Sequence, residues 1–286
     1  MKTFKKMRFE EERALYGEVG IRLLSCAFEG EADGESALKE ASDIEAVNCS
    51  FKLRYPFWHC KDVKICGSEM TEECRAALWY SDDILVENSR LHGIKAVREC
   101  NRVSLNDCDI LSAEFGWFSS DVLMRRTSVT SEYFMLRAKS LMFSDVDFRG
   151  KYSFQYITDS TFDNCNFDTK DAFWHAKNVT VKNSVVKGEY LAWYSENLTF
   201  ENCLIIGTQP LCYCKNLRLI NCRTEGCDLA FEKSSVYAEI VGGIDSIKNP
   251  ESGKICVERA DLILDSPTEC EIYFKSNETE NTVCRV

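Results

Sequence analysis

The chain has 286 residues, 45% of them hydrophobic, and a formal net charge of −11 from 46 acidic and 35 basic residues. A net-acidic chain without a stripe of lysine and arginine is a poor partner for nucleic acid or an anionic membrane, because both require clustered positive charge. Residues 1–20 lack the apolar core of a signal peptide, and no apolar run approaches membrane-spanning length, so we expect a cytoplasmic protein with neither partner.

An apolar position recurs along the chain, at first with uneven spacing. Intervals of 23, 19 and 21 residues separate Ile21, Ile44, Val63 and Ile84 in turn. The excess in the first interval contains a helix-like stretch, residues 34–41, and the excess in the third is a two-residue insertion. The series therefore predicts a repeat with two interruptions near its start.

From Ile84 onward the spacing is regular. Eight steps of nineteen residues lead to Val236, and Ser160 is the single position reached that is not aliphatic. The residue two places further on is apolar in every repeat, as at Val86 and Phe200, which indicates a strand with one buried face. A small residue, a further apolar residue and a turn residue follow, so each repeat reads strand, corner, short strand, turn, aromatic-rich strand, corner.

These repeats predict an all-β fold, a single-stranded right-handed parallel β-helix with about eleven coils. A leucine-rich repeat is the rival, but its units run to roughly 20–29 residues and include a helix or 3₁₀ segment, whereas the second half here is aromatic-rich. We expect one domain over residues 1–286, with 1–20 as an N-terminal cap, 21–243 as coils and 244–286 as divergent coils and a C-terminal cap. Within the last part, residues 244–253 read as a loop.

Two ladders follow from the repeat and belong to the scaffold. Asparagine recurs at one corner position, as at Asn183, Asn202 and Asn221, where stacked amides can hydrogen-bond along the coils. Cysteines such as Cys203 and Cys222 come next, and we interpret them as small apolar plugs inside that corner. In a reducing compartment the sixteen cysteines are expected to be free thiols, and no spacing typical of structural zinc occurs.

The aromatic strand holds the remaining signal. Alternation predicts a core face with the pairs Phe115/Trp117, Phe134/Leu136, Ala172/Trp174, Leu191/Trp193 and Leu229/Phe231. The opposite face would be an outer wall of tyrosines with a carboxylate and a histidine. The candidate ligand-binding residues on this wall are Tyr133, Tyr152, Tyr156, Asp171, His175, Tyr190, Tyr194 and Tyr213.

A contiguous exposed aromatic patch usually marks a binding site or an interface. The first hypothesis is that the wall binds a carbohydrate or related small ligand, because tyrosine rings beside acceptors suit sugar rings. The second is a scaffold whose wall is covered by a protein partner or by another copy in a homo-oligomer. The third, a polysaccharide lyase or glycoside hydrolase, would need two or three acids or a cation converging in a groove.

No catalytic motif supports the enzymatic hypothesis. The sequence has no Gly-rich phosphate loop, no Cys-x-x-Cys, and no Gly-x-Ser-x-Gly, so we expect neither a metal nor a cofactor. Asp171 and His175 lie roughly 13 Å apart along a strand, too far to pair directly. A second cluster near the N-terminal end, Arg54, Tyr55 and His59 with Arg75, is equally without a motif.

Several aromatic segments also resemble a known family, among them Arg54-Tyr-Pro-Phe-Trp-His59, Glu114-Phe-Gly-Trp-Phe118 and Asp171-Ala-Phe-Trp-His175. The chain is similar over nearly its whole length to bacterial proteins classed as a domain of unknown function, sometimes titled hydrogenase-4 component G. The resemblance implies a right-handed β-helix like that of the pectin-lyase superfamily. It implies no established activity, and no iron–sulfur or nickel ligand set is present to match the hydrogenase title.

Overall fold

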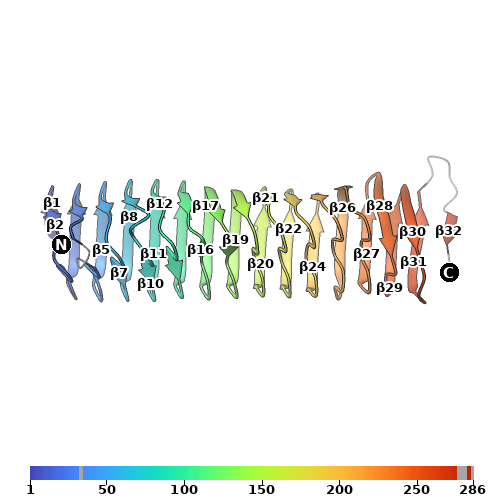
Figure 1. Cartoon of the computed structure of the whole chain (residues 1–286), viewed down its shortest axis with the longest axis horizontal. Coiled ribbons are helices and arrows are strands. Elements are labelled where there is room, and N and C mark those ends of the chain that lie inside the picture. The colour runs from blue at the N-terminus through green and yellow to red at the C-terminus, as the bar shows by residue number, and fades with distance from the viewer. Residues whose placement is uncertain (32–34, 276–281, 285–286) are drawn as a thin grey trace. The chain divides into compact units, whose positions relative to one another are not determined.

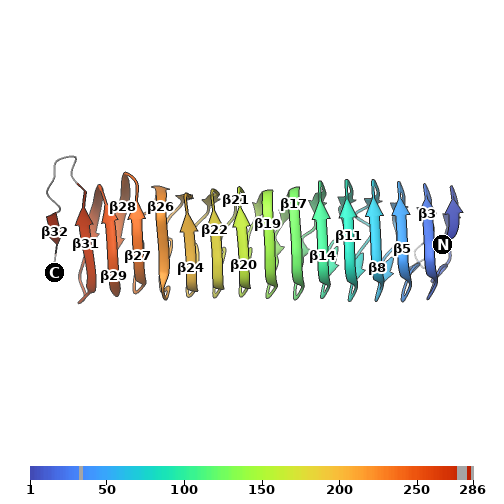
Figure 2. The same cartoon turned by 180° about the vertical axis from the view of Figure 1, so that it is seen from behind.

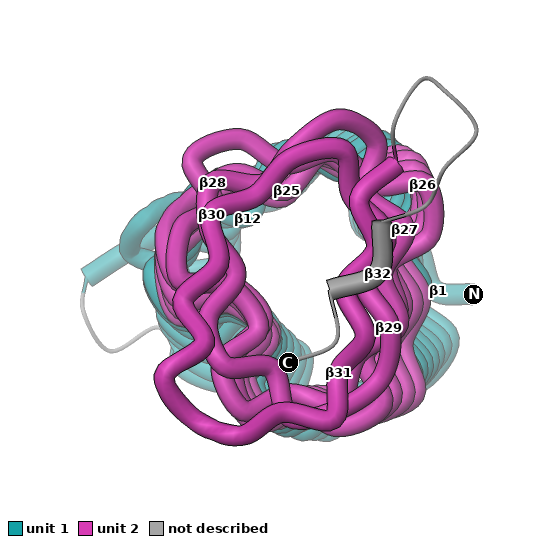
Figure 3. The backbone as a smooth tube through the Cα atoms, turned by 90° about the vertical axis from the view of Figure 1, so that its right-hand side faces the viewer, with its two compact units in different colours: residues 1–149 teal, residues 150–286 magenta. Residues whose placement is uncertain are grey.

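The computed structural model describes residues 1–31, 35–275 and 282–284, which form strands and turns. None of these residues belongs to a helix, so no helix in this part of the chain is long enough to cross a membrane. The chain divides into two compact units, residues 1–149 and 150–286 (Figure 3), and Figure 1 labels the strands of each. Residues 35–41 form no helix, with a turn at residues 37–40 in place of the helix-like stretch expected there, and residue 34 lies outside the described part.

The first unit repeats three kinds of strand, one on each side of the coil. The longest strands form its main sheet: β1 (Lys2–Lys5), β3 (Val19–Leu24), β5 (Ser42–Val47), β8 (Lys61–Cys66), β11 (Asp82–Glu87), β14 (Asn101–Asn106), β17 (Ser120–Ser131) and β19 (Lys139–Gly150). Short strands follow the corner: β2 (Arg8–Phe9), β4 (Ala27–Phe28), β6 (Ser50–Phe51), β9 (Glu69–Met70), β12 (Arg90–Leu91) and β15 (Asp109–Leu111). Two-residue strands complete the coil: β7 (Phe57–Trp58), β10 (Leu78–Trp79), β13 (Val97–Arg98), β16 (Glu114–Phe115) and β18 (Tyr133–Phe134).

The second unit keeps the first two sides of this coil. Its long strands are β20 (Thr158–Asp163), β22 (Lys177–Lys182), β24 (Glu196–Glu201), β26 (Leu217–Glu225), β27 (Ser235–Ile240), β29 (Ser252–Val257) and β31 (Glu269–Phe274). The others are β21 (Asn166–Asp168), β23 (Val185–Lys187), β25 (Leu204–Ile206), β28 (Gly243–Lys248), β30 (Arg259–Ile263) and β32 (Thr282–Cys284). In Figure 3 its turns overlie one another around a common interior, which buried side chains fill.

Neighbouring coils pair in parallel, and the pairing follows the register predicted from the repeat. In the first unit Ile21 lies beside Ile44, and Val63 beside Ile84, so both interruptions fall where the sequence placed them. In the second unit Ser160 pairs with Val179 with no change of period. Figure 2 shows the resulting rows of parallel strands, β3, β5, β8 and β11 in one unit and β20, β22 and β24 in the other. The parallel β-helix is confirmed.

The coil count is higher than the predicted eleven, because both ends of the chain continue the stack. Residues 1–20, expected as a cap, contribute β1, which pairs with β3 at the nineteen-residue spacing. Eight long strands lie in the first unit and seven in the second, counting the described residues. After Val236 the spacing falls to seventeen residues, as β29 and β31 show, and residues 244–248 lie in β28 rather than in the expected loop. In these shorter coils the residues no longer match the small-residue and asparagine positions of the nineteen-residue repeat.

The corners use left-handed main-chain conformations, which explains the asparagine ladder. Asn183, Asn202 and Asn221 have φ values of 50–53°, a region that asparagine tolerates better than most residues. Asn202 donates to Oδ1 of Asn183 over 3.2 Å, and Asn221 donates to Oδ1 of Asn202 over 2.8 Å. The predicted ladder is confirmed. A second one, Asn178–Asn197–Asn216, runs along the corner before the long strands with bonds of 2.9 and 2.8 Å.

The cysteines after the asparagine corner are buried, as predicted. Their Sγ atoms lie near main-chain carbonyl oxygens of the preceding coil, at 3.4 Å for Cys203 and 3.3 Å for Cys222. Burial raises the pKa of the Cys49 and Cys108 thiols to about 11, so these groups remain protonated donors at neutral pH. The Cys49 and Cys108 thiols therefore fill the corner and donate weak hydrogen bonds rather than acting as nucleophiles.

Candidate functional site

The aromatic segment of the second unit is a chain of turns, not the strand that alternation predicted. Asp171, Phe173 and His175 all have left-handed φ values, of 52°, 59° and 54°. In a strand, successive side chains point to opposite faces, and the left-handed residues interrupt this alternation. As a result Asp171, Ala172 and Phe173 are buried in succession, while Trp174 and His175 are half-buried.

This geometry corrects the predicted core face. Phe115, Phe134, Ala172, Leu191 and Phe231 are buried as expected. Their predicted partners are half-buried at the surface instead: Trp117, Leu136, Trp174, Trp193 and Leu229. Two residues outside these pairs, Phe154 and Phe173, are also buried, and their rings stack at a centroid distance of 4.9 Å.

Four of the predicted site residues form one stack, which we call the aromatic ladder: Tyr156, His175, Tyr194 and Tyr213. Successive ring centroids lie 4.8, 5.1 and 4.9 Å apart, with interplanar angles of 10°, 11° and 12°. This spacing is the separation of neighbouring coils, so each coil contributes one ring. Tyr156 and Tyr194 are 39% and 47% exposed, and the ladder therefore faces solvent.

A carboxylate continues the ladder after its fourth ring. The Tyr213 hydroxyl donates to Glu232 Oε2 over 3.2 Å, and Lys248 lies 3.1 Å from Oε1 of the same carboxylate. Burial, followed by the charge of Glu232, raises the pKa of the Tyr213 phenol. The Tyr213 hydroxyl therefore stays protonated and acts as a hydrogen-bond donor to Glu232.

Two tryptophans beside the ladder tie neighbouring coils together. The rings of Trp174 and Trp193 are parallel within 5° at a centroid distance of 5.6 Å. Their indole N–H groups donate to the carbonyl oxygens of Tyr190 and Gln209, each over 2.7 Å. The Tyr190 ring stands edge-on to Trp193 at 5.3 Å. The tryptophans therefore support the ladder from the side.

The other predicted residues take different places. Asp171, expected on the outer wall, is only 8% exposed. Tyr152 is half-buried on the coil before Asp171, as Tyr190 is on the coil after it. Tyr133 belongs to the first unit, where its ring meets Trp117 edge-on at 6.1 Å. Of the eight candidates, the structure joins four in the ladder and places Tyr152, Asp171 and Tyr190 on a parallel row of the same unit.

The cluster around His59 in the first unit is larger than the sequence indicated. His59 stacks on Tyr80 at 5.0 Å, and Trp58 on Trp79 at 5.9 Å. The Lys39 ammonium lies 4.2 Å from the centroid of Trp58. Trp58, Trp79 and Tyr80 were missed because the two-residue insertion shifts them out of the nineteen-residue count, and a comparison at 21 residues would have found them.

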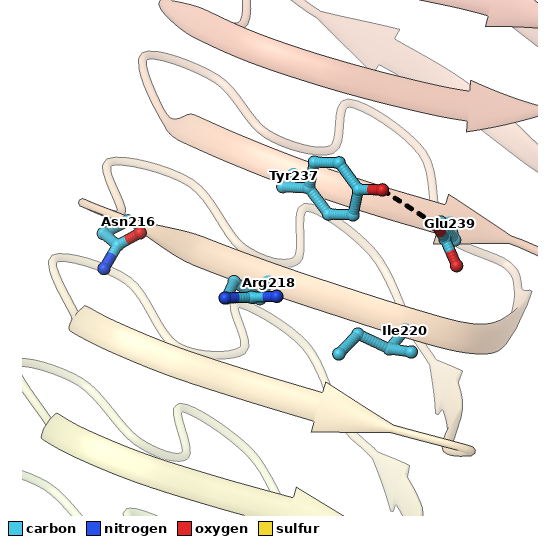
Figure 4. A pocket seen from close by; sticks show the side chains of 5 residues that line it. All are labelled: Asn216, Arg218, Ile220, Tyr237 and Glu239. Carbon is cyan, nitrogen blue, oxygen red and sulfur yellow. Dashed lines mark hydrogen bonds between the residues drawn. The ribbon is translucent and has the colours of Figure 1, made fainter.

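The remaining surface features are shallow. Figure 4 shows an open hollow on the outer side of β26 and β27, where Arg218 faces Tyr237 and the Tyr237 hydroxyl donates to Glu239 over 2.8 Å. Within the described ranges, no group of three histidine, cysteine, aspartate or glutamate side chains is placed to hold a metal ion. The aromatic ladder has four rings aligned one per coil, two of them on exposed tyrosines, and we take it as the candidate site.

Comparisons with known proteins agree with the absence of a recognisable motif. The model of a family described as protein of unknown function, DUF3737, matches residues 2–273. No curated protein matches the chain. Among solved structures, full-length QnrB1, a plasmid-mediated fluoroquinolone resistance protein, is 12% identical and covers 77% of this chain and 87% of its own, with a TM-score of 0.25. A trypsin-treated variant of QnrB1 is 11% identical and covers 77% of this chain and 89% of its own, with a TM-score of 0.23. Scores this low transfer nothing to this chain.

Proposed function

The chain belongs to the DUF3737 family of proteins of unknown function, and we propose that it is a binding scaffold whose second unit docks a protein partner on the aromatic ladder. One observation carries the proposal, namely four stacked rings that face solvent with Tyr194 47% exposed. Holding large apolar rings at the surface costs hydrophobic free energy that a partner would recover by covering them. Tyrosine and tryptophan are also the side chains enriched at the centres of protein interfaces.

The stacking favours a protein over a sugar. A sugar ring packs its C–H face against an open aromatic face. In the ladder both faces of His175 and both faces of Tyr194 are covered by neighbouring rings about 5 Å away. What these rings offer to solvent is their edges and, for tyrosine, a hydroxyl. Edges and hydroxyls suit the mixed apolar and hydrogen-bonding contacts of a protein surface, so carbohydrate binding is the weaker proposal.

The other two roles are kept as alternatives that the same experiment separates. A homo-oligomer would bury the ladder against a second copy of the chain. A lyase or glycosidase would need free acids near the ladder. There Glu189 is paired with Lys170 and Glu232 with Lys248, each at 3.1 Å, while Asp171 is buried. A relation to pectin-lyase enzymes stays a prediction from sequence.

Site-specific cross-linking tests the proposal. A benzoylphenylalanine at position 194 is expected to capture one defined protein in cells, whereas the same probe at position 237 is not. Tyr237 is a matched control because it is 41% exposed in the same unit but lies outside the ladder. The captured protein is then purified and titrated against the wild type, and Tyr194→Ala is expected to weaken its binding by about tenfold or more, while Tyr237→Ala leaves it unchanged.

Any one of four results would contradict the proposal. The first is that the probe at position 194 captures nothing above the position 237 control. The second is that the purified protein binds Tyr194→Ala as well as it binds the wild type. The last two concern other occupants of the ladder. Light scattering at micromolar concentration reveals a dimer that Tyr194→Ala dissociates, which assigns the ladder to self-association. A glycan array gives binding that depends on Tyr194, which assigns it to carbohydrate.

A further inference from the structure

Asp171 is a buried carboxylate that the protein leaves without a partner. Its residue is 8% exposed, and none of the described residues forms a hydrogen bond or an ion pair with its side chain. Lys170, the adjacent cation, pairs with Glu189 instead, at 3.1 Å. Among the described residues, the fully buried side-chain polar atoms without a partner belong to Trp58, Thr71 and Trp79. The Asp171 oxygens therefore still reach solvent, and a group approaching from outside can supply the donors that the protein does not.

The surroundings of Asp171 suit a cation. Main-chain hydrogen bonds place it between Tyr152 on one coil and Tyr190 on the next: Tyr152 N donates to Lys170 O, and Asp171 N donates to Glu189 O. The short aspartate therefore occupies one rung of a row whose neighbouring rungs carry rings. The Lys170 ammonium already lies over the Tyr190 ring, 5.8 Å from its centroid. A cation in this place meets an aromatic face and a carboxylate together.

We propose that Asp171 is the anionic floor of a subsite that receives an arginine of the protein partner. The guanidinium pairs with the Asp171 carboxylate and stacks on Tyr190, displacing the Lys170 ammonium from that ring. This inference rests on the proposed function and names the chemical group that the partner presents beside the ladder.

Arginine fits this rung better than lysine. The planar guanidinium donates two parallel hydrogen bonds to one carboxylate and stacks on an aromatic face with the same plane. An ammonium is a point charge, and the one already available, on Lys170, bonds to Glu189 rather than to Asp171. Rings on successive coils lie about 5 Å apart, so a planar group placed above Asp171 continues the spacing of the row.

The test uses the whole chain and acetyl-arginine N-methylamide as the probe, with binding followed by NMR on labelled tyrosine. Saturable shifts at Tyr190 are expected for this probe, with weaker binding of the lysine analogue and none of the uncharged citrulline analogue. Asp171→Asn is expected to weaken arginine binding by about tenfold or more. Lys170→Met should tighten it, because the competing ammonium is gone.

Asp168→Asn is the matched control, since it removes one negative charge from the same coil at a carboxylate that is paired with Lys187. It should bind the probe as the wild type does. Equal binding of the arginine and citrulline probes, or wild-type affinity in Asp171→Asn, overturns the inference. Weaker binding in Lys170→Met also overturns it, because Lys170 would then be part of the site. If these arms fail while capture still depends on Tyr194, the proposed function stands without the arginine subsite.

Discussion

Phe173 and Trp174 are adjacent residues with opposite roles, and the left-handed conformation at Phe173 separates them. Phe173 is fully buried and contacts Phe154 and, edge-on at 6.4 Å, Phe200. Trp174 is half-buried and contributes one hydrogen bond and one ring stack. We therefore expect the larger side chain, Trp174, to contribute less to stability than Phe173, because less of it is buried.

We predict that Phe173→Ala lowers the free energy of unfolding by about 3–5 kcal/mol, because it opens a cavity in the core. Trp174→Ala is expected to cost about 1–2 kcal/mol, from one hydrogen bond and part of one stack. Urea unfolding followed by circular dichroism compares the two variants. Trp174→Phe serves as a control that keeps an aromatic ring and loses only the hydrogen bond. A greater loss for Trp174→Ala would restore the face assignment expected from alternation.

Asp171 makes stability depend on pH in an unusual direction. Burial raises the pKa of its carboxyl, with smaller effects from Lys170 and Glu189. The folded state therefore binds the proton more readily than the unfolded state, and the free energy of unfolding falls as pH rises from the ordinary aspartate pKa to the raised one. Above that interval the loss is complete, so the ionised carboxylate destabilises the fold at pH 7.

Asp171→Asn removes this term, and we predict a higher free energy of unfolding at pH 7, by about 1 kcal/mol. The advantage over wild type should shrink as pH falls toward about 4, where the wild-type carboxyl is protonated too. Urea titrations of both proteins from pH 4 to 7 provide the measurement, with Asp168→Asn as the exposed control. A variant less stable than wild type at pH 7 would mean that the carboxylate has a structural partner.

Among the elements, the asparagine ladder has a middle rung with two bonds. Asn202 donates to Asn183 and accepts from Asn221, and its main chain has a φ of 53°. We predict that Asn202→Ala costs about 2–3 kcal/mol, from both bonds and from the left-handed conformation. Asn202→Gly relieves the conformational part and is expected to cost about 1 kcal/mol less. Thermal or urea unfolding distinguishes the two, and equal costs would assign the whole effect to the amide.

The contrast between this ladder and the aromatic segment explains what the sequence could predict. Asparagine at a recurring corner is itself a signal for left-handed backbone, so both its conformation and its hydrogen bonds were predictable. Phe173 and Tyr194 carry no such signal, because phenylalanine and tyrosine are uncommon at positive φ. Alternation was therefore applied to a segment that does not alternate. Residue type and spacing were enough to find the candidate site. They were not enough to predict how its rings stack.

At the scale of the whole molecule, register was the most predictable property. Parallel coils place equivalent residues of successive repeats side by side. The spacing of the repeated apolar position therefore predicted which residues pair across coils, namely Ile21, Ile44, Val63 and Ile84. The coils after Val236 were less predictable, because a spacing of seventeen residues breaks the positional match while main-chain pairing persists. Pairing depends on main-chain hydrogen bonds that every residue except proline can form, so stacking outlasts the sequence signature.

A repeat fold of this kind should tolerate the removal of one complete coil. Each coil contacts its neighbours alone, and stability is close to a sum over repeats and interfaces. Deleting residues 178–196 joins Lys177 to Asn197 and leaves every later strand in register, because Asn178 and Asn197 hold equivalent positions. We predict that this variant folds. The slope of its unfolding free energy against urea concentration should be smaller, because one coil less of surface is exposed on unfolding. The ladder is expected to re-form with His175 beside Tyr213.

The matched control is a deletion of residues 178–187, about half a coil, which removes most of β22 and all of β23. The coil that remains is incomplete, so the coils on either side of it cannot pair along all their strands. We expect this variant to lose the cooperative unfolding transition of its second unit, seen by urea titration with circular dichroism. A full-coil deletion that unfolds just as completely would show that stability in this unit is not divided among neighbouring coils. In the full-coil deletion, the fluorescence or NMR signal of Tyr213 reports whether its ring now stacks on His175.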